Sequence, residues 1–423
     1  MNNYDLAKES GEVKLSIVIC VYNTDPVYVD ECIGSVRRSS LSDYEIIFVD
    51  DGSTVDYTAT VEKYGVRYSK TENRGLFGAR LHGISLAVGD YIAFVDSDDT
   101  VSANYHLPML HAAEQTGADI VLNDWAFNPG RIRHYCTQDS TIAGDVDVTG
   151  DALAFYTSQR GREHSYFVQW NKLFRRELLI KVAADIAKTE AKDKHIVYAE
   201  DALMNFFSFK NATRVVGIHS GFYFYRIHGE QSVVAGSEAR LRSQIELMSF
   251  ALDEMERGID GRESAERIRA DINEWRALMS RAHFDAARRS GFTSLYGLIT
   301  EAYRVENLTR PLPKDSSAYK STEIIGKNFD EIDARLTELW LSGKEAAVAP
   351  SDGTKYIGRF LGYYERATGG RIRRGGGGVK LPKNGVPIKQ RIIYNRVVYS
   401  IGSILFKKGS RLRGFLKKLA GAR

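Results

Sequence analysis

Two groups of acidic residues stand where apolar, strand-like segments end. Residues 45–49 are followed by Asp-Asp-Gly-Ser at positions 50–53, and residues 91–95 run into Asp-Ser-Asp-Asp at positions 96–99. If both segments are parallel strands of one sheet, their carboxyl ends share an edge, where such sheets bind ligands. Crowded carboxylates repel one another unless a cation lies among them. The pattern therefore favours a site for Mg²⁺ or Mn²⁺, which prefer oxygen ligands and usually share their coordination with substrate phosphates.

The elements that must position these residues alternate between strand and helix patterns. Strand patterns occupy about 15–21, 45–49, 66–68, 91–95 and 119–122, and helix patterns about 26–36, 54–64, 78–88 and 104–116. Near-continuous apolarity is typical of parallel strands that are covered on both faces. Repeated strand–helix units predict an α/β fold, with a mostly parallel sheet between helices on both faces. From Glu238 to about Arg304 the pattern is helical, and a further helical stretch is expected at about 329–341.

The order of the motifs along the chain resembles that of a known enzyme family. The matching segments are 16–23, 49–53, 89–99, 170–174, 200–201 and 225–232. Over about residues 14–235 they are similar to glycosyltransferase family 2, with the Rossmann-like GT-A fold, of the bacterial polysaccharide and glycolipid type. This resemblance implies transfer of a sugar from a nucleotide-sugar donor, with a UDP-sugar as the expected class. The implied acceptor is a saccharide or a lipid-linked acceptor in surface polysaccharide synthesis.

The resemblance also implies roles for residues on the donor side. Asp51 would contact the base of the donor nucleotide, and Tyr22 and Asn23 would line the nucleotide pocket. Asp96 and Asp98 would form the DxD motif. In that motif Asp98 would bind the metal directly, and Asp96 would reach the ribose or the metal.

On the acceptor side, Asp201 would be the general base, which takes the proton of the acceptor hydroxyl as the new bond forms. Arg226 and His228 would lie near the diphosphate or close the site, with His228 a candidate metal ligand. The metal and a cation such as Arg226 would stabilise the departing nucleoside diphosphate. An in-line attack of this kind inverts the anomeric centre.

Simpler explanations exist for several of these residues. The acidic turn at 50–53 could only cap the next helix, and the Glu-Asp pair at 200–201 could only favour a helix N-terminus. His228 could hydrogen-bond locally, and Trp170 could belong to the core instead of stacking on an acceptor sugar. Arg80 could approach phosphate, but we expect a surface salt bridge for it.

Charge is divided unevenly along the chain. The last 58 of the 423 residues contain 16 Lys and Arg and no Asp or Glu, whereas residues 1–365 carry 42 basic and 54 acidic residues, a net charge of −12. As helices, 388–406 and 411–419 would place apolar residues opposite cations, which favours contact with an anionic membrane surface. A disordered tail, or one packed on the acidic body, is the alternative. No recognition module supports nucleic-acid binding, so we expect no nucleic acid as partner.

These patterns divide the chain into segments. They are a tail at 1–13, a GT-A domain at 14–237, a helical region of unknown role at 238–365, a Gly/Arg-rich linker at 366–387, and a basic amphipathic tail at 388–423. The start lacks the apolar stretch of a signal peptide, and no apolar run approaches the roughly 20 residues of a spanning helix. The three cysteines match no zinc or redox motif. We therefore expect a cytoplasmic enzyme, peripheral at the inner face of the membrane.

Two rival functions fit parts of the pattern. A nucleotidyltransferase also binds nucleotides on a similar sheet, but it would need a Gly-rich, basic loop directly after the first strand. Tyr-Asn-Thr-Asp at positions 22–25 is not that loop. A catalytically inactive, membrane-docked scaffold would have no need of Asp96, Asp98 and Asp201, so their presence argues against it. Metal-dependent hydrolysis of UDP-sugars would separate an enzyme from a scaffold.

Overall fold

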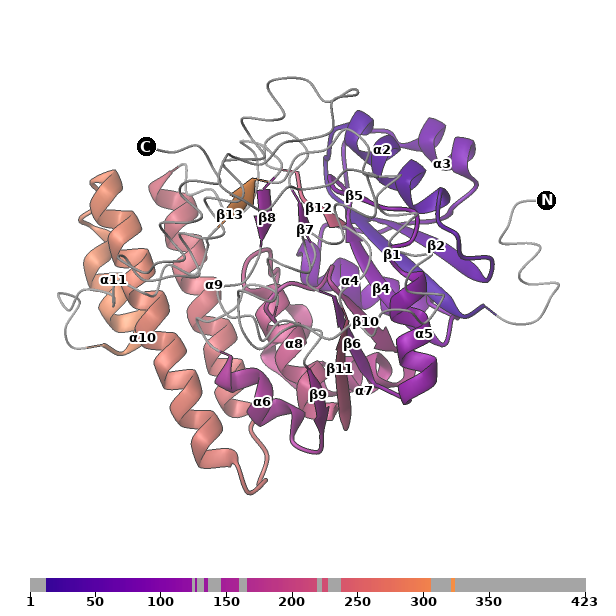
Figure 1. Cartoon of the computed structure of the whole chain (residues 1–423). Helices are drawn as coiled ribbons and strands as arrows, with labels where there is room; N and C mark the ends of the chain where they lie inside the picture. The colour runs from indigo at the N-terminus through magenta and orange to yellow at the C-terminus, as the bar shows by residue number, and fades with distance from the viewer. Residues whose placement is uncertain are drawn as a thin grey trace, which may run out of the picture.

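The computed structural model describes residues 13–123, 146–159, 166–218, 223–226 and 237–305, together with short strands at 126–127, 133–135 and 321–323. Its main sheet has eight strands (Figure 1). In spatial order they are β3 (Arg67–Lys70), β2 (Tyr44–Asp50), β1 (Leu15–Val21), β4 (Tyr91–Asp96), β10 (Lys172–Arg175), β6 (Ile120–Asn123), β11 (Arg214–Ile218) and β9 (Asp147–Thr149). Strands β3, β2, β1 and β4 are parallel, and only β10 and β9 run against their neighbours.

Helices cover both faces of this sheet, because successive residues of each strand point to opposite sides. In β1, Ile17 and Ile19 pack into one core with α2 (Pro26–Arg37) and α5 (Leu107–Thr116). Val18 and Cys20 pack into the other core, on the opposite face of the sheet. The helices of that core include α4 (Gly75–Leu86), α7 (Arg176–Ile186) and α8 (Glu200–Asn211). The predicted fold class, α/β with a mostly parallel sheet between two helical layers, is confirmed.

The helix after β2 begins later than the sequence pattern indicates. We predicted a start near Thr54, but α3 spans Thr58–Tyr64. The backbone N–H groups of Thr54 and Val55 donate instead to the side-chain oxygen of Asn23, at 2.8 and 3.4 Å. The Asp56 carboxylate then accepts a 2.9 Å hydrogen bond from the N–H of Thr58. A loop tied to Asn23 therefore takes the place of the expected first helical turn.

A second sheet brings a distant segment to the end of β4. Its order is β13 (Ser321–Glu323), β8 (Arg133–Tyr135), β7 (Ala126–Phe127), β12 (Tyr223–Phe224) and β5 (Thr100–Val101). Strand β5 directly follows the acidic turn at 96–99, and β12 pairs with it in antiparallel fashion. Arg226, two residues after β12, is thereby placed beside that turn.

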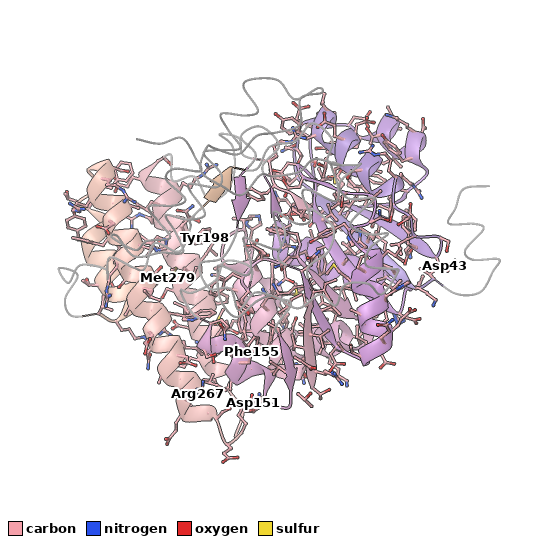
Figure 2. The ribbon with its side chains drawn as sticks, viewed as in Figure 1. Asp43, Asp151, Phe155, Tyr198, Arg267 and Met279 are labelled. Atoms are coloured by element: carbon pink, nitrogen blue, oxygen red, sulfur yellow. The ribbon has the colours of Figure 1, made fainter. Side chains whose placement is uncertain are left out.

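Three helices follow the sheet domain, as the sequence predicts. They are α9 (Glu238–Arg257), α10 (Ala265–Ser290) and α11 (Leu295–Tyr303), and they stand together along one side of the molecule (Figure 1). They share a core with α8 and with α6 (Ala152–Ser158). Trp275 of α10 meets the ring of Tyr156 edge-on at 5.5 Å, and Thr157 donates to the carboxylate of Asp271 at 3.0 Å. Figure 2 labels Met279 and Tyr198 on this side of the molecule and Asp43 on the opposite side.

Several predicted segments lie outside the described residues. They are the tail at 1–12, a helical stretch expected at 329–341, the linker at 366–387 and the basic tail at 388–423. Among the helices that the structure describes, none is both long enough and apolar enough to cross a membrane.

A close approach of α4 to β1 gives a first testable prediction. A Cβ added at Gly83 would lie 2.4 Å from Cγ1 of the buried Val18, a distance that real contacts do not reach. We expect Gly83→Ala to destabilise the fold by about 1–3 kcal/mol, through overpacking. The measurement is the free energy of unfolding in urea, for Gly83→Ala alone and in a Val18→Ala background.

In that background the γ-methyl groups are gone, so the added cost of Gly83→Ala should shrink. Gly297 of α11 is the matched control, because a Cβ added there meets nothing within 4 Å. Gly297→Ala should leave stability unchanged or raise it by up to about 1 kcal/mol. An equal loss from Gly83→Ala in both backgrounds would contradict this account of the packing.

Candidate active site

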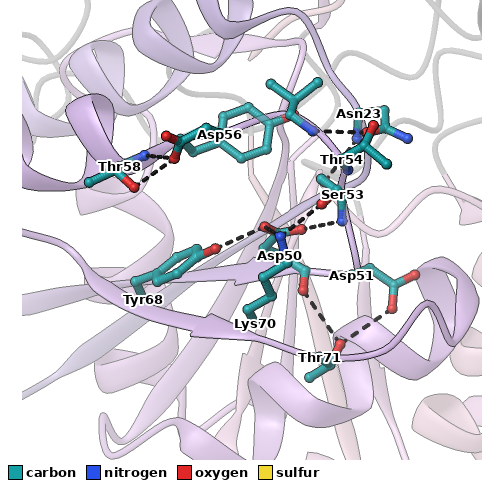
Figure 3. Close-up of polar contacts among 12 residues, drawn as sticks. Asn23, Asp50, Asp51, Ser53, Thr54, Asp56, Thr58, Tyr68, Lys70 and Thr71 are labelled. Atoms are coloured by element: carbon teal, nitrogen blue, oxygen red, sulfur yellow. Dashed lines mark hydrogen bonds and ion pairs between the residues drawn. The ribbon is translucent and has the colours of Figure 1, made fainter.

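The loops after β1 and β2 are tied together by Asn23. Its backbone, at a φ of 52°, lies in the left-handed region that asparagine tolerates better than most residues. Its N–H donates to the Ser53 hydroxyl at 3.0 Å, and its side-chain oxygen accepts from the N–H and the hydroxyl of Thr54 (Figure 3). Tyr22, just before it, is 54% exposed. The structure therefore gives Asn23 the task of shaping the loop, and leaves the Tyr22 ring accessible.

Two neighbouring carboxylates at the end of β2 have different surroundings. Asp50 accepts hydrogen bonds from the Ser53 N–H at 2.7 Å and the Tyr68 hydroxyl at 2.8 Å, and it pairs with Lys70 at 3.3 Å (Figure 3). Burial alone would raise the pKa of Asp50, but these hydrogen bonds outweigh it and the pKa lies below its usual value. Asp50 is thus an ionised structural anchor.

Asp51 is the second of this pair. One of its oxygens accepts from the N–H of Arg74 at 2.8 Å. Burial raises the pKa of Asp51, although hydrogen bonds from the Arg74 and Gly75 N–H groups oppose the shift. The turn after Asp51 is possible because Gly52 has a φ of +81°, and a Cβ there would lie 2.8 Å from the Asn73 nitrogen. Asp51, at the end of β2, is therefore bound to the backbone at the start of α4.

The acidic turn after β4 is bound to the segment after β12. The Asp99 carboxylate is 1% exposed and accepts from the Arg226 N–H at 2.7 Å. The Arg226 guanidinium donates to the backbone oxygen of Asp98 at 2.8 Å, lies 4.1 Å from the centre of the Tyr28 ring, and pairs with Glu31. Arg226 therefore lies against the acidic turn, and its contacts with Tyr28 and Glu31 of α2 hold it there.

Arg80 of α4 joins the acidic turn to the start of α8. Its side chain is 2% exposed, and its two terminal nitrogens point to different elements. One nitrogen pairs with Asp96 at 3.2 Å, and the other pairs with Asp201 and lies 3.5 Å from Glu200. Burial acts to lower the pKa of Arg80, but the three carboxylates outweigh it and raise the pKa above its usual value. A permanently charged guanidinium thus sits among three acids.

Two of the carboxylates around this cation, Asp96 and Glu200, keep their protons to higher pH than usual. Burial raises the pKa of Asp96 to about 6, with Arg80 opposing the shift and Asp201 and Asp98 adding to it. Burial, followed by the charge of Asp201, raises the pKa of Glu200 to about 8. One guanidinium therefore does not neutralise the whole group, and a further cation would be stabilised here.

The start of α8 is defined by a residue with a left-handed backbone and by buried polar side chains close to it. Ala199, the residue before the helix, has a φ of 64°, which a residue with a Cβ seldom adopts. The Gln169 side chain donates to the backbone oxygen of Asp201 at 3.0 Å. Lys172 is fully buried nearby and donates to Asn171 at 2.9 Å and to a backbone oxygen. Burial lowers the pKa of Lys172 to about 7, against the pull of Asp201.

A divalent cation would fit this site only if it shared its coordination with substrate phosphates. Among the described residues, no group of three or more His, Cys, Asp or Glu side chains could hold a metal. The partly exposed carboxylates at the end of β4, Asp96 and Asp98, offer oxygen ligands without a complete protein cage. Mg²⁺ and Mn²⁺ bind in this way, through one or two carboxylates together with substrate phosphates.

The structure therefore brings most of the predicted residues to one edge of the sheet. Asp51 lies at the end of β2, Asp96 and Asp98 at the end of β4, and Asp201 at the start of α8. Arg226 lies beside the same acidic turn. His228 lies outside the described residues.

Two interpretations of single residues are now decided. Our expectation of a surface salt bridge for Arg80 was wrong, because its side chain is buried. The signal was present in the sequence: Phe77 and Ile84, three residues before and four after, are apolar and mark the inner face of α4. Trp170 is 4% exposed and stacks on Tyr223 at 4.2 Å, so it belongs to the core.

His195 had no role in the sequence interpretation, and it proves to link two loops. Its ring nitrogen lies 2.8 Å from the side-chain oxygen of Asn73. Asn73 precedes Arg74, whose N–H binds Asp51, and His195 lies five residues before Glu200. Nothing in the spacing of His195 indicated this contact, because it depends on how two distant loops meet.

Comparison with known proteins identifies the domain. Residues 16–183 match the family model described as "Glycosyl transferase family 2". The Bacillus subtilis (strain 168) protein named "Uncharacterized glycosyltransferase EpsJ" is 32% identical over 217 residues, which are 50% of this chain and 60% of EpsJ. "Putative glycosyltransferase EpsH" of the same organism is 27% identical over 294 residues, covering 66% of this chain and 82% of EpsH.

Among solved structures, S. aureus TarS 1–349 in complex with UDP aligns at 19% identity and a TM-score of 0.41, covering 74% of this chain and 97% of TarS 1–349. A similarity this low has no bearing on the site. The sheet and the acidic residues at its carboxyl edge define an α/β protein with a candidate ligand site where its parallel strands end. The match over residues 16–183 makes this part of the chain similar to glycosyltransferase family 2.

The raised pKa of Glu200 gives a prediction for stability against pH. The folded protein keeps the Glu200 proton up to a pH of about 8, whereas the ordinary value is 4.5. The folded state therefore binds more protons than the unfolded chain between these values, and this group makes stability fall as pH rises. Glutamine does not titrate, so the Tm of Glu200→Gln relative to wild type should rise by at least about 3 °C between pH 5 and pH 8.

The measurement is thermal unfolding in metal-free buffer at both pH values. Glu190→Gln is the control, because the Glu190 side chain is 76% exposed and its pairing with Arg257 is at the surface. Its Tm difference from wild type should stay flat. A flat difference for Glu200→Gln as well would show that Glu200 is already ionised in the folded protein.

Proposed function

We propose that the protein is an inverting glycosyltransferase that transfers a sugar from a nucleotide sugar, with a UDP-sugar as the expected donor, to a hydroxyl of a saccharide or lipid-linked acceptor. The observation that carries the proposal is the Arg80 cluster. It holds the Asp96 carboxylate of the acidic turn and the Asp201 carboxylate of α8 on one guanidinium. A metal-side acid and a separate acid that can serve as base are what this reaction requires.

The nucleotide would lie across the ends of β1 and β2. Tyr22 offers an exposed aromatic face for stacking, and Asp51 offers a carboxylate that can accept from a donor N–H of the base. The loop between them is already fixed by the Asn23 hydrogen bonds, so little ordering is needed when the nucleotide binds. Such preorganisation lowers the entropic cost of binding.

The diphosphate would lie at the end of β4. Asp98 would bind Mn²⁺ or Mg²⁺, with Asp96 close enough to bind the same ion or the ribose. The metal, when bound, offsets the negative charge that develops on the leaving diphosphate. Arg226 lies beside Asp98 and adds a second positive charge on the same side. His228, two residues further on, is also a proposed metal ligand, and it lies outside the described residues.

Asp201 would accept the proton of the acceptor hydroxyl. Its side chain is 25% exposed, so it can be reached from solvent while its neighbour Arg80 is not. Its carboxylate lies on α8, apart from the acidic turn that would bind the metal. A carboxylate on α8 can activate an acceptor hydroxyl that attacks from the face opposite the leaving group. An attack from that face inverts the anomeric carbon.

Substitutions at the two acids should separate donor binding from turnover. Asp98→Ala should abolish the Mn²⁺-dependent part of donor binding, because it removes the proposed metal ligand. Asp201→Asn should change the donor Kd by less than about twofold and lower the rate of UDP release by roughly 10²- to 10⁴-fold, the usual contribution of a general base. Donor binding is measured by calorimetry. Turnover is measured as the rate of UDP release with water as the acceptor.

The probes are UDP-glucose, UDP-galactose and UDP-N-acetylglucosamine, ranked first by thermal shift with and without Mn²⁺. Asp147→Asn is the matched control, because Asp147 lies on the distant edge strand β9 with a side chain that is 65% exposed. It should change neither quantity. Full turnover by Asp201→Asn would refute the base assignment, and no stabilisation by any of the three probes would refute the donor class.

We further propose that the basic tail at 388–423 holds the enzyme at the anionic inner face of the membrane, where a lipid-linked acceptor is presented. The support is its charge: residues 388–423 carry 10 basic and no acidic residues. Apolar residues are interleaved with these cations, as in helices that lie in a membrane interface.

Removal of the tail should therefore abolish membrane binding. The chain ending at residue 387 should lose at least about tenfold in its partition onto vesicles of 30% phosphatidylserine, measured by cosedimentation at 0.1 M salt. Both chains should bind equally little to neutral phosphatidylcholine vesicles. Equal binding of both chains to the anionic vesicles would place the membrane contact elsewhere, or remove it altogether.

A further inference from the structure

Arg80 is buried too deeply to bind the substrate itself. Its side chain is 2% exposed, whereas those of its partners Asp96 and Asp201 are 28% and 25% exposed. The guanidinium therefore touches the inner side of two carboxylates whose outer sides reach solvent. Any effect of Arg80 on the reaction is therefore transmitted through Asp96 and Asp201.

The planar shape of the guanidinium is used in full. Nη2 pairs with Asp96 at the end of β4, and Nη1 pairs with Asp201 at the start of α8. The guanidinium carbon also lies 5.8 Å from the centre of the Phe94 ring of β4. A lysine ammonium is a single point of charge on a flexible stem, and it cannot hold two acids in two fixed directions.

Asp201 has little else to fix its side chain. Among the residues that the structure describes, Arg80 is the one hydrogen-bond donor to the Asp201 carboxylate. The Gln169 side chain binds only the backbone oxygen of Asp201. The position of the carboxylate relative to β4 is therefore set by the bridge from Arg80.

We propose that Arg80 is a positioning residue that fixes the proton-accepting carboxylate of Asp201 relative to Asp96, and so keeps the acceptor side of the site in register with the donor side. This inference rests on the proposed role of Asp201. It assigns Arg80 no contact with the nucleotide sugar or the metal, so donor binding should survive its replacement while turnover falls.

The test compares Arg80→Lys and Arg80→Gln with wild type, using the UDP-sugar that gives the largest thermal shift with Mn²⁺. Lysine keeps a buried cation among the acids but loses the bridge. We expect Arg80→Lys to change the donor KM by less than about threefold and to lower kcat for UDP release by roughly 10- to 100-fold, as for a misplaced catalytic group. Arg80→Gln should lose at least as much kcat.

A double-mutant cycle with Asp201→Asn shows whether Arg80 acts through Asp201. Once Asp201→Asn has removed the base, Arg80→Lys should lower the remaining kcat by less than about twofold, because interacting catalytic groups are not additive. Arg276→Lys is the matched control, since Arg276 is a 4% exposed arginine paired with Asp253 and Glu256 in the helical region. It should lower Tm and leave kcat unchanged.

The outcomes separate the two proposals. If Asp201→Asn keeps full kcat, the proposed function of Asp201 fails. If Asp201→Asn loses kcat but Arg80→Lys lowers it again by its full factor in that background, only the role of Arg80 is refuted. Unchanged kcat in Arg80→Lys also refutes it. Failure of both Arg80 variants to fold would do the same, because Arg80 would then be a residue of the fold and not of positioning.

Discussion

The site depends on a single buried positive charge. Arg80 lies among the carboxylates of Asp96, Glu200 and Asp201, in surroundings where an unpaired charge would cost several kcal/mol. This need for pairing constrains three elements at once, because the arginine is on α4 and its partners are on β4 and α8. Helix α4 can approach the sheet closely enough because Gly83 leaves room for Val18. The packing of a helix on a strand is thus linked to the position of the acids.

The donor side is ordered by a separate hydrogen-bond network. Asn23 and Asp50 bind the turn after β2 from two sides, without any contribution from the Arg80 cluster. The two regions meet in the loop before α8. His195 binds Asn73 near Asp51, and a Cβ on Gly75 would lie 2.7 Å from the backbone oxygen of Ile196. A nucleotide at Asp51 would therefore lie against the same loop that leads into Glu200 and Asp201.

Charge balance supports the proposal that the site binds a metal and a diphosphate together. The raised pKa values of Asp96 and Glu200 show that one guanidinium does not satisfy the acids around it. A divalent cation alone would find too few protein ligands, since no described group of three suits it. A cation that arrives with phosphate oxygens completes its coordination and relieves the repulsion. The helices α9–α11 contribute indirectly, because they share a core with α8 and so support the helix that carries Asp201.

The sequence by itself determined the sheet, the layers and the acidic strand ends, because buried parallel strands and helix caps leave local patterns of apolar and polar residues. It indicated Asp51, Asp96 and Asp98 for the same reason, because each follows a strand, and it indicated Asp201 through the family resemblance. The tertiary structure decided what lies between the elements. The burial of Arg80 depends on how α4 meets β4 and α8, and the contact of His195 with Asn73 joins residues 122 positions apart. The apolar spacing around Arg80 marks the inner face of α4, but local patterns carry no record of which distant residues a side chain meets there.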